Sequence, residues 1–261
     1  KSFQMNPDQT KIIALELIDT FKKAGIVAIE LRKKGLIKKI KPDNTPVTNA
    51  DIEINNILLN KISGLTPNIP VISEETSLNK KNENLKDFWL IDPIDGTNSY
   101  INNKDEFTIN AALIINKKPY LGLINVPEKK RLFYSYGPSN SYEITNNKER
   151  KLINLDKKNK NIITAVSYSN NLNSKILEFH NKFKVNTYKK VKSSLKFCLI
   201  AAGEFDLYIA DPRAHEWDIA AGHAILEHAG GSVTDFNGNV IEYGKKNFIN
   251  TSLILKSKNI L

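Results

Sequence analysis

The chain has 261 residues, a net charge of +10 and one cysteine, Cys198. The length suits one large domain or two closely packed halves, and a single cysteine excludes an intrachain disulfide and favours a reducing compartment. No stretch reaches the roughly 18 uninterrupted apolar residues of a membrane span, and residues 1–4 lack a secretory pattern. We therefore expect a cytoplasmic protein without an integral membrane segment. Peripheral attachment at the cytoplasmic face of the membrane is left open.

The first half, residues 1–150, begins with helical spacing of apolar residues and continues with short apolar runs. Asp8 is the expected cap of the first helix, which is one long helix or two, and Gly35 is its expected end. Asp92 and Pro93 are expected to end a buried strand. Short turns predict antiparallel neighbours among the later strands. The expected helices cover residues 7–35 and 47–64, and the expected strands cover residues 71–73, 88–91, 107–115, 120–126 and 131–136.

A polar stretch at residues 146–161 separates this half from a second one, residues 151–261, in which strands and helices alternate. Alternation of this kind predicts an α/β layer. The fold class expected for the whole chain is therefore a layered α+β or α/β structure. The expected elements are strands at residues 162–168, 206–210 and 232–235 and helices at residues 172–183, 194–202 and 218–229.

Residues 92–97 read Asp-Pro-Ile-Asp-Gly-Thr and directly follow a buried strand. Asp92 and Asp95 offer the carboxylate oxygens that Mg²⁺ prefers, and Gly96 leaves room for a ligand near the backbone. If Gly96 and Thr97 open a helical turn, their N–H groups are placed to bind phosphate oxygens. Taken alone, this segment also fits an Asx turn that caps a helix.

Two further acidic positions favour the metal interpretation. Glu74 and Glu75 follow a short apolar strand, and Asp218 stands at the start of a helix in the other half. A site for several Mg²⁺ ions needs several carboxylates that converge on a small volume. The sequence supplies them at the ends of separate elements.

Four segments together resemble the signatures of the inositol monophosphatase superfamily, in that family's order. They are residues 47–51 (Val-Thr-Asn-Ala-Asp), 73–75 (Ser-Glu-Glu), 92–97 and 217–222 (Trp-Asp-Ile-Ala-Ala-Gly). The resemblance covers nearly the whole chain. It implies the αβαβα sandwich of the inositol monophosphatase and fructose-1,6-bisphosphatase type, and Mg²⁺-dependent hydrolysis of a phosphomonoester. A homodimer is a family-level expectation.

The resemblance also implies which residues hold the metal ions. Glu74, Asp92 and the backbone carbonyl of Ile94 would bind one Mg²⁺. Asp92, Asp95 and Asp218 would bind a second, which makes Asp92 the bridging ligand. A weaker third ion is expected near Glu74.

The same resemblance implies catalytic roles for Asp51, Thr97 and Glu74. Thr97 would orient the attacking water, and Asp51 would accept its proton through Thr97, which is general-base chemistry. Asp51 and Asp218 also fit as caps of the helices that they begin. Glu75 is expected outside the set of metal ligands.

The substrate depends on a different segment. Residues 192–198 (Lys-Ser-Ser-Leu-Lys-Phe-Cys) resemble a segment of bacterial 3′(2′),5′-bisphosphate nucleotidases, and Ser193, Ser194 and Lys196 form a plausible pocket for a second phosphate. Lys192 stands where that group usually has Gly. The expected substrate contacts are completed by four residues of the metal segments: Asp95, Gly96, Thr97 and Asp218.

Three hypotheses follow for function. The first is hydrolysis of 3′-phosphoadenosine 5′-phosphate to AMP and phosphate. The second is inositol monophosphatase activity, which is favoured by Asn98 and Ser99 where nucleotidases commonly have Lys-Glu. The third is an RNA-binding protein on a phosphatase scaffold, and the intact acidic set argues against it. We expect a small anionic phosphate ester as the partner, and no nucleic-acid polymer.

The histidines are not spaced as zinc ligands usually are. His215 and Arg213 lie close to Trp217 in the sequence, and we expect them at the mouth of the substrate pocket.

Overall fold

The computed structural model describes residues 5–76, 85–152, 162–258 and 260. The helices are α1 (Pro7–Lys34), α2 (Asn49–Leu65), α3 (Thr97–Ile101), α4 (Ser174–Lys182), α5 (Leu195–Ala201) and α6 (Glu216–His228), with 3-10 turns η1 (Pro127–Lys129) and η2 (Lys246–Phe248). The strands of the first sheets are β1 (Lys38–Ile40), β2 (Pro46–Thr48), β3 (Val71–Ser73), β4 (Phe88–Asp95), β5 (Thr108–Ile115), β6 (Lys118–Val126), β7 (Arg131–Ser135), β8 (Ser141–Thr145) and β9 (Lys148–Lys151). The remaining strands are β10 (Ile163–Ser167), β11 (Val185–Lys190), β12 (Leu207–Ala210), β13 (Ser232–Thr234) and β14 (Leu253–Lys256).

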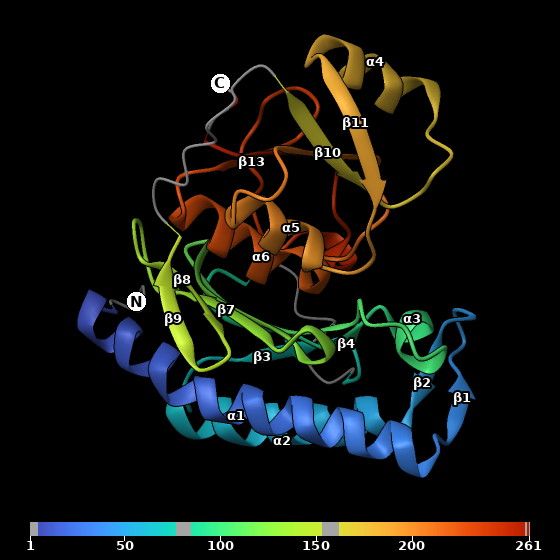
Figure 1. Ribbon diagram of the computed structural model, residues 1–261. Coiled ribbons are helices and arrows are strands. Elements are labelled where there is room, and N and C mark those ends of the chain that lie inside the picture. The colour runs from blue at the N-terminus through green and yellow to red at the C-terminus, as the bar shows by residue number, and fades with distance from the viewer. Residues whose placement is uncertain (1–4, 77–84, 153–161, 259, 261) are drawn as a thin grey trace.

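The elements lie in five layers, which confirms the expected αβαβα sandwich (Figure 1). Helices α1 and α2 cover one face of a seven-stranded sheet with the order β3-β4-β5-β6-β7-β8-β9. Helices α5 and α6 lie between this sheet and a five-stranded sheet with the order β11-β10-β12-β14-β13, and α4 covers the outer face of the second sheet. Both faces of each sheet are therefore shielded, and this explains why central strands read as continuous apolar runs.

Strand β4 does not end where the sequence predicted. It continues through Pro93 to Asp95, and its register against β5 shifts between Asp92, which pairs with Asn110, and Asp95, which pairs with Thr108. Three steps along β4 match two along β5, so β4 carries one extra residue. Proline has no N–H to donate to a ladder and is tolerated at such a bulge. The prediction that Asp92 and Pro93 end the strand was wrong for this reason.

The ends of the first helix follow local capping rules. Helix α1 is one helix, and its cap is Asn6 rather than Asp8: Asn6 Oδ1 accepts a hydrogen bond from the Gln9 backbone at 2.8 Å, and Gln9 Oε1 accepts one from the Asn6 backbone at 3.1 Å. Pro7 takes the first helical position, where its missing N–H costs nothing. Gly35 ends the helix with a φ of 100°, as predicted.

Several strands were not predicted. The hairpin β8–β9 occupies residues 141–151 and turns on Asn146 and Asn147, both with positive φ. Two consecutive residues of that kind suit a tight hairpin turn. Its turn and β9 fall in the first part of the polar separator predicted at residues 146–161. The rest of the separator, residues 153–161, lies outside the described residues. Strands β11 and β14 were also not predicted. Strand β11 is a polar edge strand and lacks the apolar run that marks a buried strand.

The middle helical layer binds the two sheets into one core. A single hydrophobic cluster includes Ile124 from the first sheet, Cys198 and Ile225 from α5 and α6, and Leu255 from the second sheet. Cys198 is buried, as expected. The division at residue 150 therefore stays an interpretation. Within the described ranges, no helix is both long and apolar enough to cross a membrane.

Candidate active site

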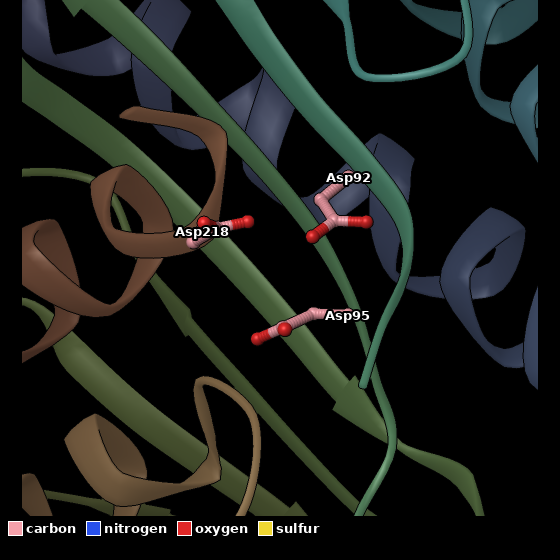
Figure 2. Close-up of side chains that lie close together, drawn as sticks. All are labelled: Asp92, Asp95 and Asp218. Carbon is pink, nitrogen blue, oxygen red and sulfur yellow. The ribbon is translucent and has the colours of Figure 1, made fainter. Parts of the chain in front are cut away.

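Three carboxylates from two distant segments meet at one point. Asp92 and Asp95 stand on the bulged end of β4, and Asp218 stands in the first turn of α6. One oxygen of each lies within 4.8 Å of the others, and Figure 2 shows the three side chains around a common space. Residues three apart in a regular strand face opposite sides of a sheet, so the extra residue of the bulge is what brings Asp92 and Asp95 to the same side.

The charge in this cluster is not balanced by the protein. Burial, together with Glu74, Asp95 and Asp218, raises the pKa of Asp92 well above its usual range. Asp92 Oδ1 is buried and has no hydrogen-bond partner among the residues that the structure describes. Burial raises the pKa of Asp95 to about 6, although Lys196 and the Ser194 N–H act in the opposite direction. Burial, Asp95 and Glu74 raise the pKa of Asp218 to about 8. Such a group of carboxylates is expected to attract hard cations.

Backbone hydrogen bonds orient the carboxylates of Asp95 and Asp218. Asp95 Oδ2 accepts a hydrogen bond from the Ser194 N–H at 2.5 Å, which ties β4 to the segment before α5. Asp218 Oδ2 accepts one from the His215 N–H at 2.7 Å, in the first turn of α6. Asp218 is therefore not the N-cap that the sequence suggested: the N-cap is His215, and Asp218 is the third helical residue, whose carboxylate reaches back to the N-cap backbone. The same side chain also faces the acidic cluster.

Glu74 completes the acidic wall. It follows β3, its N–H donates to the Ile91 carbonyl at 3.1 Å, and it lines a cavity of about 270 Å³ together with Asp92, Asp95 and Asp218. Lys41, in the β1–β2 turn, donates to Glu74 Oε1 at 2.8 Å and to Glu75 Oε1 at 2.7 Å.

Lys41 was missed by sequence reasoning. Although burial lowers its pKa, the two glutamates raise it overall. No sequence pattern marks Lys41 as part of the site, because only the folded β1–β2 hairpin brings this lysine to Glu74.

Asp51 and Thr97, the expected proton-accepting pair, make separate hydrogen bonds. Asp51 Oδ2 accepts from the Thr48 N–H at 2.7 Å and the Thr48 hydroxyl at 2.6 Å, which forms the capping box of α2. The Thr97 hydroxyl donates to the Ile94 carbonyl at 3.1 Å. In the described parts of the chain, no hydrogen bond joins Asp51 to Thr97, and their shared role stays a prediction. Burial raises the pKa of Asp51.

A second cavity, of about 190 Å³, adjoins the acidic one and has a basic lining. The two cavities share Asp95, Lys192, Ser193 and Asp218. The remaining polar wall of the second cavity is formed by Ser194, Lys196, Arg213 and the tyrosines Tyr168 and Tyr208. The acidic and the basic cavity are therefore adjacent.

The serines of residues 192–198 are already engaged by the protein. The Ser194 hydroxyl is bonded to Asn110 Oδ1 at 2.8 Å and to the Thr108 hydroxyl at 2.7 Å, so that β5 fixes the N–H that holds Asp95. Ser193 has a φ of 57°, and its hydroxyl donates to the Glu106 carbonyl. In this geometry Ser194 supports Asp95 through its backbone, and its hydroxyl is turned to other protein groups.

Three cationic side chains line the basic cavity: Lys192, Lys196 and Arg213. Lys196 Nζ donates to the Ser193 carbonyl at 2.6 Å, and burial lowers the pKa of Lys196 to about 8. Lys192 Nζ donates to the Tyr168 carbonyl at 3.2 Å, and the Arg213 guanidinium lies 3.8 Å from the centre of the Tyr168 ring. Burial, Lys190 and Arg213 all lower the pKa of Lys192, as expected where like charges crowd together.

The structure separates the two residues predicted at the pocket mouth. Arg213 lines the basic cavity. The His215 ring instead stacks on Trp217, with ring centres 4.6 Å apart and an angle of 8° between the planes. His215 thus donates a backbone hydrogen bond to Asp218, and its ring packs on Trp217 in the first turn of α6.

Comparisons with known proteins agree with this geometry. The chain is 39% identical over 215 residues to the 3′(2′),5′-bisphosphate nucleotidase CysQ of Buchnera aphidicola, covering 81% of this chain and 80% of the relative. It is 30% identical to the CysQ protein of Aggregatibacter actinomycetemcomitans, covering 95% of this chain and 94% of the relative.

Solved structures give the same result. CysQ from Bacteroides thetaiotaomicron, described as a bacterial member of the inositol monophosphatase family, superposes with a TM-score of 0.77 at 28% identity and covers 94% of this chain and 97% of its own. An IMPase/NADP phosphatase complexed with Mg²⁺ and phosphate shares the fold, with a TM-score of 0.79 at 19% identity and coverage of 96% and 92%. The family model described as the inositol monophosphatase family matches residues 8–260. This chain therefore belongs to the inositol monophosphatase family.

Proposed function

We propose that the chain is a Mg²⁺-dependent 3′(2′),5′-bisphosphate nucleotidase that releases the 3′-phosphate of 3′-phosphoadenosine 5′-phosphate and leaves AMP. The observation that carries the proposal is the pair of adjacent cavities: Glu74 and Asp92 line only the first, and Lys196 and Arg213 line only the second. A monoester with a single phosphate needs only the first compartment. A bisphosphate has a use for both.

The acidic compartment fits Mg²⁺ by its own chemistry. It offers only oxygen ligands, and Asp92 Oδ1 is buried without a partner in the part of the chain that the structure describes. Glu74, Asp92 and the Ile94 carbonyl would hold one ion, and Asp92, Asp95 and Asp218 a second. Mg²⁺ supplies charge neutralisation at the phosphate and lowers the pKa of water.

The residues around the acidic compartment would place and deprotonate the nucleophile. Thr97 lies at the start of α3, next to the cluster, and would orient the attacking water. Asp51 would accept the proton through Thr97, and its raised pKa makes it a stronger base than an ordinary aspartate. Gly96, with a φ of 85°, allows the backbone to turn so that its N–H and that of Thr97 approach the scissile phosphate.

The basic compartment would hold the phosphate that is not cleaved. Arg213 offers a planar fork of donors that matches phosphate oxygens, and Lys192 and Lys196 add positive charge. The Tyr168 ring supports the Arg213 guanidinium from one side, so less side-chain freedom is lost on binding.

The test compares phosphate release from three substrates: 3′-phosphoadenosine 5′-phosphate, 3′-AMP and inositol 1-phosphate. We expect the highest kcat/KM for the bisphosphate. Inositol monophosphatase activity is the second candidate, because the uncharged side chains of Asn98 and Ser99 line the acidic cavity. A strong preference for inositol 1-phosphate contradicts the nucleotidase proposal.

A variant of the basic compartment extends this test. Arg213→Ala should raise the KM for the bisphosphate about tenfold, the scale of a lost charge-assisted hydrogen bond. It should leave the KM for 3′-AMP nearly unchanged, because Arg213 lines the basic cavity and not the acidic one. Lys175→Ala, on the exposed face of α4, is the matched control. An equal effect on both substrates would show that Arg213 does not bind the second phosphate.

The proposed partner is thus a small anionic phosphate ester. A third metal ion, a homodimer and a cytoplasmic location stay predictions. Sedimentation of the purified chain tests the dimer.

A further inference from the structure

A buried carboxylate outside the acidic cluster holds a remote piece of backbone. Glu216 begins α6, two residues before Asp218, and its side chain has an exposed fraction of 0%. Glu216 Oε2 accepts a hydrogen bond from the Gly244 N–H at 2.8 Å, and Oε1 accepts one from the Lys245 N–H at 2.9 Å. Lys245 Nζ lies 2.7 Å from Oε1. A buried charge is retained only with such full pairing.

We name residues 243–248 the strut, because the same segment also contacts the sheet that carries the other metal ligands. The Tyr243 N–H donates to the Lys117 carbonyl, in the turn between β5 and β6, at 3.0 Å. Gly244 has a φ of 82°, and a Cβ there would lie 2.7 Å from the Leu85 carbonyl oxygen, close to the start of β4. The strut therefore lies against the backbone of Leu85, shortly before β4 begins.

Aromatic packing adds contacts from the strut to β4 and to α6. The Phe248 ring lies 6.1 Å from the Phe88 ring, at the first residue of β4, and 6.1 Å from the Trp217 ring, next to Asp218. One ring of the strut thus touches the first residue of the strand that carries Asp92 and Asp95 and the neighbour of Asp218.

A second attachment fixes the strut to α6. The Tyr243 hydroxyl is 2.8 Å from His223 Nδ1, and His223 Nε2 is 2.9 Å from Glu227 Oε1. The strut is consequently held to α6 at two places seven residues apart, which defines both its position and its direction along the helix.

Asp92 and Asp95 lie on β4 and Asp218 lies on α6, and these two layers have no peptide connection near the site. Mg²⁺ demands near-ideal geometry at short metal–oxygen distances, so small changes in the spacing of the layers affect binding. We propose that Glu216 is a positioning residue: by holding the backbone of Gly244 and Lys245, it locks the strut between α6 and the start of β4. The strut in turn sets the position of Asp218 relative to Asp92 and Asp95. This inference rests on the proposed Mg²⁺ dependence.

The test measures Mg²⁺ affinity by calorimetry and the melting temperature without metal. In Glu216→Gln the amide nitrogen cannot accept one of the two backbone hydrogen bonds, and the charge facing Lys245 is lost. We expect the Mg²⁺ affinity of the folded protein to fall about tenfold or more, the range found when groups that support metal ligands are changed. Asp206→Asn is the control, because Asp206 is also a buried carboxylate that accepts from a backbone N–H, that of Thr164 at 2.8 Å, away from the strut.

The outcomes separate positioning from simple stabilisation. Weaker Mg²⁺ binding in Glu216→Gln, with unchanged affinity in Asp206→Asn, supports the proposal. A lower melting temperature with unchanged Mg²⁺ affinity overturns it. If Glu216→Gln does not fold, Tyr243→Phe replaces it, because this variant removes only the contact to His223. A fall in affinity in Tyr243→Phe supports the proposal, and unchanged affinity contradicts it. Absence of Mg²⁺ binding by the wild-type chain would instead refute the proposed function.

Discussion

Asp92 shows at the scale of one residue what a buried acidic cluster costs in stability. Its carboxyl is buried against Glu74, Asp95 and Asp218, and one of its oxygens has no partner among the described residues. Without a cation these groups repel each other, and each buried oxygen has lost its water. The folded protein tolerates this arrangement because the surrounding strands and helices hold it in place.

Replacement of Asp92 should therefore raise the stability of the metal-free protein and abolish its function. In Asp92→Asn the amide can donate to a neighbouring carboxylate, so we expect the metal-free protein to melt about 2–4 °C higher, which corresponds to about 1 kcal/mol for a chain of this size. Mg²⁺ binding and turnover should be lost. Thermal unfolding with and without Mg²⁺ checks both effects, and a lower metal-free melting temperature would contradict the charge argument.

The acidic residues also predict how stability depends on pH. The pKa values of about 6 for Asp95 and about 8 for Asp218 lie above those of an unfolded aspartate, so between about pH 4 and pH 8 the folded chain binds more protons than the unfolded chain. The contribution of these groups to the free energy of unfolding therefore falls as the pH rises through this window. Denaturant unfolding of metal-free Asp218→Asn should show a weaker fall over this window than wild type, and identical slopes would contradict the raised pKa values.

Mg²⁺ binding should consequently release protons near neutral pH. Metal ligation requires the ionised carboxylates, and Asp218 is largely protonated at pH 7 without metal. Titration calorimetry in two buffers with different ionisation enthalpies measures the release directly. Equal observed enthalpies in the two buffers would mean that the carboxylates are already ionised.

At the scale of elements, close approach of backbones determines the spacing of layers. Helix α6 rests directly on β6 at Gly122, where a Cβ would lie 2.4 Å from the Ala221 carbonyl oxygen. Since α6 carries Asp218 and β6 pairs with β5 beside β4, this contact helps to set the distance across the acidic cluster. Glycine is required here by contact with another backbone, because its own φ is not positive.

Gly122→Ala should separate α6 from the sheet. Because the facing group is a carbonyl, which moves only with its helix, we expect a loss of about 2–3 kcal/mol in the free energy of unfolding and weaker Mg²⁺ binding. Gly64→Ala in α2 is the control: nothing lies within 4 Å of its added Cβ, and the variant should be about 0.5–1 kcal/mol more stable. Denaturant titration measures both, and equal stabilities would contradict the packing argument.

At the scale of the whole molecule, the positive charge would favour capture of the proposed anionic substrate. The net charge is +10, Lys192 and Arg213 line the basic cavity, and Lys190 is close enough to Lys192 to lower its pKa. A field of this sign raises the encounter rate of a multiply charged anion, and salt screens it. The charge therefore has a use that does not involve a nucleic-acid polymer.

The dependence on salt follows from this field. Between about 20 mM and 200 mM KCl, kcat/KM should fall more steeply for 3′-phosphoadenosine 5′-phosphate than for 3′-AMP, because the bisphosphate carries more charge. Initial rates at low substrate concentration and fixed Mg²⁺ provide the measurement. If kcat/KM fell equally steeply with salt for the two substrates, the positive field of the protein would not contribute to substrate capture.

The sequence alone determined the layered fold, the acidic segments and the family that they resemble, because apolar periodicity and short motifs are local properties. It also placed Asp92, Asp95 and Asp218 in one site through that resemblance. Only the tertiary structure revealed the bulge that turns Asp92 and Asp95 to one side, the Lys41 contact with Glu74, and the engagement of the Ser194 hydroxyl by β5. The strut that Glu216 holds belongs to the same group. These features depend on strand register and on contacts between residues far apart in the chain, and neither can be read from the spacing of residues within one segment.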